Sequence, residues 1–141
     1  MTGAYEVASV EETWELARKL AAELKAGDVV CLEGDLGAGK TTFTQGLAAA
    51  LGVAGRVTSP TFCIVQEHRG KDAFLVHMDL YRLHDEDDVL AIGWEDYLSD
   101  GAILVVEWPE RAGALIPESA RHICFTHSGD GACTRRIDIN A

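Results

Sequence analysis

The chain has 141 residues, 48% of them hydrophobic, which suits a single domain over residues 1–141 with one core. Its 23 acidic residues outnumber its 12 basic ones and give a formal net charge of −11. Extended contact with a nucleic-acid backbone needs clustered lysine and arginine, so this balance argues against it. There is no run of 18 apolar residues, and the first residues lack the basic and apolar segments of a secretory signal. We therefore expect a cytoplasmic protein with no membrane span.

The first predicted elements are a short strand at residues 5–8 and a helix that follows to about residue 26. Ser9 begins a capping box, in which the Ser9 hydroxyl and the Glu12 carboxylate satisfy backbone N–H groups of the first turn. Gly27 is a natural end for this helix. Trp14 and Leu24 belong to its apolar stripe, which we expect to face the core.

The next segment combines an apolar run, a glycine-rich loop and a second helix. Residues 29–32 are continuously apolar, which is typical of a buried parallel strand. Residues 34–40 form the glycine-rich loop. A helix is predicted from there to about residue 51, and Gly52 ends it.

The rest of the chain carries shorter predicted elements. Two β-like runs are separated by five residues that suit a hairpin loop. The whole pattern predicts an α/β fold, with a mostly parallel central sheet flanked by helices and antiparallel additions. The expected strands are residues 62–68, 74–79, 103–106, 121–126 and 134–139, and the expected helices or turns are residues 85–94, 95–98 and 109–115.

The glycine-rich loop fits the pattern G-x-x-x-x-G-K-[ST], a P-loop, which binds nucleotide phosphates. Glycines let backbone N–H groups turn toward phosphate oxygens, and the following helix adds its own N–H groups. A glycine-rich turn without a ligand is the alternative, but the strand before it and the helix after it favour a site for ATP or ADP with Mg²⁺ in a P-loop NTPase-like fold. The predicted nucleotide-binding residues are Gly34, Asp35, Leu36, Gly37, Ala38, Gly39, Lys40, which supplies a cation for the β- and γ-phosphates, and Thr41, whose hydroxyl suits Mg²⁺.

Two carboxylates are predicted to lie beside this loop. Asp79 and Glu107 each end an apolar run, and the ends of parallel strands meet at the edge of a sheet where ligands gather. We expect Glu107 to serve Mg²⁺ through water, and Asp79 to hold the metal's water shell or to orient the attacking water. With Lys40 they form the expected catalytic set. The alternative is that each strand simply ends at a polar residue. His77, in mid-strand, is expected to be packed rather than functional.

Three hydroxyls form a third feature. Thr58, Ser59 and Thr61 lie on a predicted loop after the second helix. Such hydroxyls can sense a γ-phosphate, as switch loops do. A strand entry fixed by Pro60 explains the same segment equally well.

These motifs together resemble the bacterial TsaE (also YjeE) family. The resemblance rests on residues 32–42, on residues 58–62, on the H-x-D-L-Y-R motif at residues 77–82 and on Glu107 followed by Trp108. It runs from about residue 12 to residue 111 and leaves the last 30 residues without a matching motif.

The resemblance implies an ATPase required for N6-threonylcarbamoyladenosine at position 37 of tRNA. In that family the protein acts on a TsaD–TsaB complex, which its ATP hydrolysis is thought to reset, so protein partners are implied rather than direct tRNA binding. Hydrolysis by the isolated subunit is expected to be slow. By carry-over, Lys40 binds phosphate, Thr41 and Glu107 serve Mg²⁺, Asp79 supports hydrolysis, Thr42 approaches the α-phosphate, and Trp108 packs near the nucleotide or the partner.

Three other classes of protein compete with this interpretation. A GTPase needs an N-K-x-D motif, and the only asparagine of the chain is Asn140. A small-molecule kinase adds a lid with arginines over the phosphates, whereas residues 82–98 are rich in acidic residues and hold no arginine cluster. A module that uses nucleotide only as a switch differs in its turnover, which an ATPase assay with and without the TsaD–TsaB pair measures.

Overall fold

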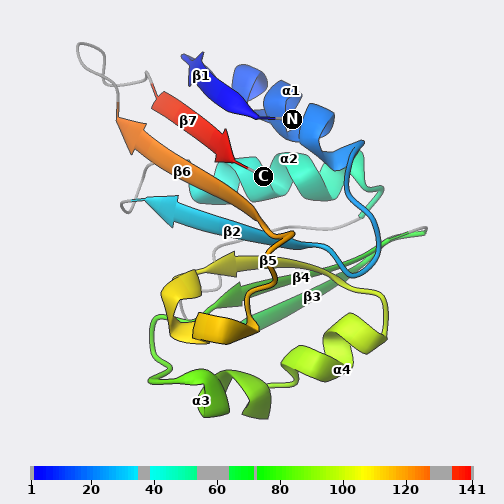
Figure 1. Ribbon diagram of the computed structural model, residues 1–141. Helices are drawn as coiled ribbons and strands as arrows, with labels where there is room; N and C mark the ends of the chain where they lie inside the picture. The colour runs from blue at the N-terminus through cyan, green and yellow to red at the C-terminus, as the bar shows by residue number, and fades with distance from the viewer. Residues whose placement is uncertain (1, 35–38, 54–63, 72, 128–134, 141) are drawn as a thin grey trace.

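The computed structural model describes residues 2–34, 39–53, 64–71, 73–127 and 135–140 of the chain. Within these residues, seven strands form one sheet in the order β1-β7-β6-β2-β5-β4-β3, with helices on both faces (Figure 1). The strands are β1 Gly3–Val7, β2 Val29–Gly34, β3 Val65–Arg69, β4 Phe74–Asp79, β5 Ile103–Glu107, β6 Arg121–His127 and β7 Arg135–Asn140; the helices are α1 Val10–Ala21, α2 Lys40–Ala50, α3 Glu86–Ala91, α4 Trp94–Ser99 and the 3-10 helix η2 Pro109–Leu115.

The middle of the sheet is parallel. Strands β6, β2, β5 and β4 are neighbours in that order and run in the same direction. On one side β3 pairs antiparallel with β4, and on the other side β7 and β1 continue the sheet antiparallel. The α/β fold expected from the sequence is therefore confirmed. Gly34, Asp79 and Glu107 are the last residues of β2, β4 and β5, and we call the edge at which these strands end the carboxyl edge.

The sheet has two buried faces, which we name after the helices that cover them. Helices α1 and α2 cover one face, and α3 and α4 cover the other (Figure 1). Leu20 of α1 and Phe43 of α2 are buried on the α1/α2 face, whereas Val89 of α3 and Trp94 of α4 are buried on the α3/α4 face. Because side chains alternate along a strand, neighbouring residues of β4 and β5 serve opposite faces. Strand residues on the α1/α2 face include Val30, Leu32, Leu75, Val105 and Ile123; those on the α3/α4 face include Cys31, Val76, Met78, Leu104 and Val106.

Helix α1 begins as the sequence predicted and ends earlier. Ser9 is the N-cap, and its hydroxyl accepts the N–H of Glu12 at 3.1 Å. The helix stops at Ala21 instead of reaching residue 26: the N–H groups of Glu23 and Leu24 donate to carbonyls only three residues back, and the N–H of Lys25 donates to the side chain of Asp28 at 2.7 Å. Trp14, predicted to face the core, is 43% exposed.

Helices α1 and α2 approach each other closely at a glycine. A Cβ placed on Gly46 would lie 2.8 Å from the Cβ of Ala17 and 3.1 Å from the Cα of Trp14, distances shorter than carbon atoms normally tolerate. The absence of a side chain at Gly46 therefore allows the two helices to pack against each other above the α1/α2 face.

Two helix boundaries near residue 93 differ from the prediction. Residues 85–94 were expected to form one helix, but α3 ends at Ala91 and α4 begins at Trp94. Gly93 between them adopts the left-handed conformation, with φ at 100°, and caps α4. This segment therefore contains two short helices, α3 and α4. Within the described part of the chain, no helix is long and apolar enough to cross a membrane.

Candidate functional site

The two predicted carboxylates lie next to each other at the carboxyl edge. Asp79 pairs in register with Glu107 across β4 and β5, and Glu107 in turn pairs with Leu32 of β2. Their strands lie side by side in Figure 1. The amide of Leu80 donates to the carbonyl of Glu107 at 3.1 Å, which ties the ends of the two strands together. The parallel pairing therefore holds the two carboxylates on neighbouring strand ends, with Glu107 beside Lys40 at the start of α2.

At both ends of the glycine-rich loop, Gly34 and Gly39 adopt conformations that favour glycine. Gly34 has a φ of 144°, and a Cβ on it would lie 2.5 Å from the carbonyl oxygen of Phe125. Gly39 has a φ of 103° and is the N-cap of α2. Both φ values lie in the region that side chains disfavour. Of the predicted phosphate-binding residues, Asp35, Leu36, Gly37 and Ala38 lie outside the described residues.

Helix α2 is fixed by packing beneath its first turn. Phe43 is fully buried, and its ring contacts that of Phe125 of β6 edge-on, with centroids 5.5 Å apart. Gly39 has no side chain that could cap the helix. The N–H groups of the first turn, which includes Thr41 and Thr42, are therefore oriented where a phosphate could accept from them.

Lys40 joins the loop to the carboxyl edge. Its ammonium group donates to the carbonyl oxygen of Gly34 at 2.9 Å and lies 3.4 Å from Oε1 of Glu107. The Lys40 side chain is only 13% exposed, so water weakens this ion pair less than it would at the surface. Phosphate oxygens could take the place of both oxygen partners.

Glu107 is a buried, ionised carboxylate with two different partners. Its Oε2 lies 2.7 Å from Nε2 of His77, and both side chains are buried. Burial raises the pKa of Glu107, but the hydrogen bond and charge of His77, together with Lys40, outweigh burial and bring its pKa below the ordinary value. An ionised carboxylate only accepts hydrogen bonds, so the Nε2–H of His77 is the donor.

Sequence reasoning missed this contact. His77 is packed, as expected, with none of its side chain exposed, but it also touches the carboxylate predicted to serve the metal. The two residues are 30 positions apart, and only the register of β4 against β5 brings them together. One feature of the sequence could have suggested it: side chains alternate along β4, so His77 lies on the same face of the sheet as Asp79.

Asp79 has a different environment. Its Oδ1 accepts the N–H of Tyr81 at 3.0 Å, and its side chain is half-buried. Its other oxygen has no hydrogen-bond donor among the residues that the structure describes. A half-buried carboxylate at this position could reach a water molecule beside a bound phosphate.

An aromatic pair borders the carboxyl edge. The rings of Tyr81 and Trp108 are 4.8 Å apart between centroids, and the two residues are 56% and 40% exposed. Trp108 follows Glu107 directly and has a φ of 58°, an uncommon conformation for a residue with a side chain. The predicted switch residues Thr58, Ser59 and Thr61 lie outside the described residues.

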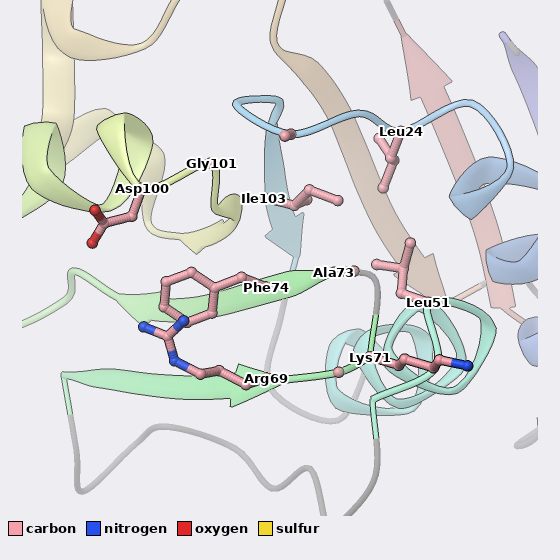
Figure 2. Close-up of a pocket in the computed structure, with 11 residues that line it drawn as sticks. Leu24, Leu51, Arg69, Lys71, Ala73, Phe74, Asp100, Gly101 and Ile103 are labelled. Carbon is pink, nitrogen blue, oxygen red and sulfur yellow. The ribbon is translucent and has the colours of Figure 1, made fainter.

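A cavity of about 420 Å³ lies at the opposite edge of the sheet (Figure 2). Phe74 and Ile103, the first residues of β4 and β5, line it together with Leu24 and Leu51. The guanidinium of Arg69 stacks over the ring of Phe74, 3.9 Å from its centroid. Because β4 and β5 run from this cavity toward Asp79 and Glu107, it is a separate feature from the carboxyl edge.

Comparisons with known proteins agree with one another. The family model described as threonylcarbamoyl adenosine biosynthesis protein TsaE matches residues 7–137. The tRNA threonylcarbamoyladenosine biosynthesis protein TsaE of Bacillus subtilis is 43% identical over 120 residues, covering 85% of this chain and 75% of that protein. The protein of the same name from Streptomyces coelicolor is 40% identical, and the match covers 90% of this chain and 98% of that protein.

A solved structure has the same architecture. The crystal structure of Bacillus subtilis YdiB superposes with a TM-score of 0.81 at 34% sequence identity, covering 100% of this chain and 86% of that one. The similarity therefore extends over β6 and β7, which pair antiparallel with each other and for which the sequence alone offered no motif.

Proposed function

Because this chain belongs to the TsaE family of threonylcarbamoyl adenosine biosynthesis proteins, we propose that it is a Mg²⁺-dependent ATPase required for the threonylcarbamoyladenosine modification of tRNA. The observation that carries the proposal is the position of Lys40. Its ammonium group lies at the start of α2, between the carbonyl of Gly34 and the carboxylate of Glu107. A cation at the N-terminus of a helix, next to an ionised carboxylate, suits the phosphates of a metal–nucleotide complex.

The residue types fit Mg²⁺. This ion prefers hard oxygen ligands and keeps several water molecules, and the site offers the hydroxyl of Thr41 and the carboxylate of Glu107. When bound, Mg²⁺ supplies positive charge that stabilises the transferring phosphoryl group. Thr41 and Glu107 would hold it, Glu107 through water.

The other residues of the carboxyl edge have distinct proposed roles. Lys40 exchanges Gly34 and Glu107 for β- and γ-phosphate oxygens when ATP binds. Asp79 orients the attacking water, because it is the neighbour of Glu107 in register and is less buried. The N–H groups of Thr41 and Thr42, in the first turn of α2, bind phosphate oxygens.

ATP is the favoured nucleotide. The chain lacks the N-K-x-D motif with which GTPases bind guanine, since its single asparagine is Asn140. A kinase lid with clustered arginines is not supported either, because α3 and the segment before it are rich in acidic residues. Transfer of the phosphoryl group to water is therefore proposed, rather than transfer to a nucleoside or a sugar.

Protein partners fit the charge of the molecule. A net charge of −11 opposes binding to the phosphates of tRNA, so the role in tRNA modification is proposed to depend on a TsaD–TsaB complex. Exposed Tyr81 and Trp108 beside the carboxyl edge would let such a complex sense the nucleotide state.

The test is phosphate release from ATP by the purified chain, alone and with a TsaD–TsaB pair. We expect slow turnover alone and faster turnover with the pair, both lost in Lys40→Ala. Lys71→Ala removes an exposed lysine at the opposite edge and should behave like the unmodified chain. A chain that binds ATP but shows no turnover under either condition would instead be a nucleotide switch.

A further inference from the structure

The strongest feature that the proposed function leaves unexplained is the burial of His77. Among the described residues, four polar or charged side chains are buried: Thr13, Thr44, His77 and Glu107. The two threonines donate to carbonyls of the preceding helical turn, at 3.2 and 2.9 Å. His77 instead uses its Nε2–H on the carboxylate of Glu107, at 2.7 Å.

We propose that His77 is a positioning residue, which holds the Glu107 carboxylate so that one oxygen faces the nucleotide. This inference rests on the proposed function, because it assigns His77 a role through the residue that is to serve Mg²⁺. The two oxygens of Glu107 are used differently: Oε2 accepts from His77, and Oε1 lies 3.4 Å from the ammonium of Lys40. A hydrogen bond to one oxygen fixes the rotation of the carboxylate, and thereby the direction of the other.

The backbone on both sides supports this arrangement. His77 and Glu107 lie on adjacent strands, on the α1/α2 face, within a continuous parallel ladder. The carbonyl of Glu107 is itself fixed by the amide of Leu80 at 3.1 Å. Because both backbones are held in the sheet, the Glu107 carboxylate can move only by rotation about its side-chain bonds. The hydrogen bond with His77 restricts this rotation.

The environment of the second ring nitrogen of His77, Nδ1, shows which substitutions can test the proposal. Its Nδ1 is buried and has no hydrogen-bond partner among the residues that the structure describes. A glutamine amide reaches about as far as Nε2 of histidine and can donate in its place, whereas an asparagine amide is too short. His77→Gln should therefore preserve the function of the site, and His77→Asn and His77→Leu should impair it.

The experiment measures the Mg²⁺ concentration at half-saturation for binding of a fluorescent ADP, and kcat and KM for ATP hydrolysis. Losing a group that orients a metal ligand typically costs about 10- to 100-fold in metal affinity or activity. We expect His77→Leu and His77→Asn to raise the Mg²⁺ requirement and lower kcat at least about 10-fold, with KM for ATP changed less than about 3-fold. His77→Gln should stay within about 3-fold of the unmodified chain in all three quantities.

Two controls separate this role from packing. His68→Leu removes a neighbouring histidine of β3 for which no contact with Glu107 is described, and should leave the Mg²⁺ requirement unchanged. Thermal unfolding identifies any variant that does not fold. If His77→Leu does not fold, the comparison of His77→Asn with His77→Gln tests the role of His77. Folded variants with the same Mg²⁺ requirement as the unmodified chain, or Gln and Asn variants impaired alike, would overturn the inference. An unmodified chain that neither binds nor hydrolyses nucleotide would instead overturn the proposed function, and the role of His77 with it.

Discussion

The two faces of strands β4 and β5 are built from alternate residues of the same segments, yet they differ in chemistry. The α3/α4 face carries Val76, Met78, Leu104 and Val106, all buried and apolar. On the α1/α2 face, Leu75 and Val105 are apolar near the start and middle of the strands, but His77 and Glu107 follow toward the carboxyl edge.

This difference shows where a small domain tolerates buried charge. Burying an ionised group is costly unless it is paired and hydrogen-bonded. Glu107 meets that condition on one face, through His77 and Lys40. On the opposite face, the buried residues that the structure describes are all apolar. Substitutions on the α1/α2 face near the carboxyl edge should therefore affect chemistry first, and those on the α3/α4 face stability first.

The largest expected effect is on hydrolysis, at the carboxyl edge. Glu107→Ala and Asp79→Ala should each lower kcat at least about 100-fold, the size typical of losing a group that handles the reacting water or metal. Asp79→Ala should spare nucleotide binding. Phosphate release and fluorescent-ADP binding measure the two quantities.

The control for these variants is Asp100→Ala, which removes an exposed carboxylate at the opposite edge and should leave kcat unchanged. Normal turnover in the Asp79 or the Glu107 variant would remove that residue from the mechanism.

Substitutions on the α3/α4 face should mainly lower the stability of the fold. Leu104, the second residue of β5, is fully buried on the α3/α4 face, and Leu104→Ala should lower the free energy of unfolding by about 2–5 kcal/mol. Denaturant unfolding measures this loss. At a temperature where the variant is folded, its KM for ATP should be close to that of the unmodified chain. A stable variant with impaired nucleotide binding would contradict the separation of the two faces.

A smaller effect should appear in the dependence of stability on pH. The pKa of Glu107 in the folded chain lies below its ordinary value of 4.5, so the unfolded chain takes up this proton first as pH falls. The contribution of the ionised carboxylate is therefore full above pH 4.5 and is lost as pH falls through the folded-state pKa. We expect the stability difference between the unmodified chain and Glu107→Gln to shift against the unmodified chain below pH 4.5, as measured by denaturant unfolding. A difference that is constant from pH 7 to pH 3 would contradict the role of His77 and Lys40 in lowering this pKa.

Local patterns in the sequence were sufficient for several elements. The apolar run ending in Asp79 predicted β4 to the residue, and the Ser9 capping box predicted the start of α1. The P-loop pattern predicted where α2 begins. In each case the determining residues are close together in the chain, so the signal is local.

Features set by distant residues were not predictable in this way. The contact of His77 with Glu107 depends on the register between two strands 30 residues apart. Trp14 is 43% exposed, whereas Leu16, Ala17 and Leu20 of the same apolar stripe are buried in the core. Tertiary packing decided both features.

The most direct test of the central claim is calorimetric titration of the purified chain with ADP and with ATP in the presence of Mg²⁺. The claim is that Lys40, at the start of α2, binds the phosphates of a metal–nucleotide complex beside Glu107. We expect saturable binding by the unmodified chain and by Lys71→Ala, and binding at least about 10-fold weaker by Lys40→Ala, as for the loss of a charge-assisted contact to phosphate. No binding by the unmodified chain, or equal binding by Lys40→Ala, would contradict the claim.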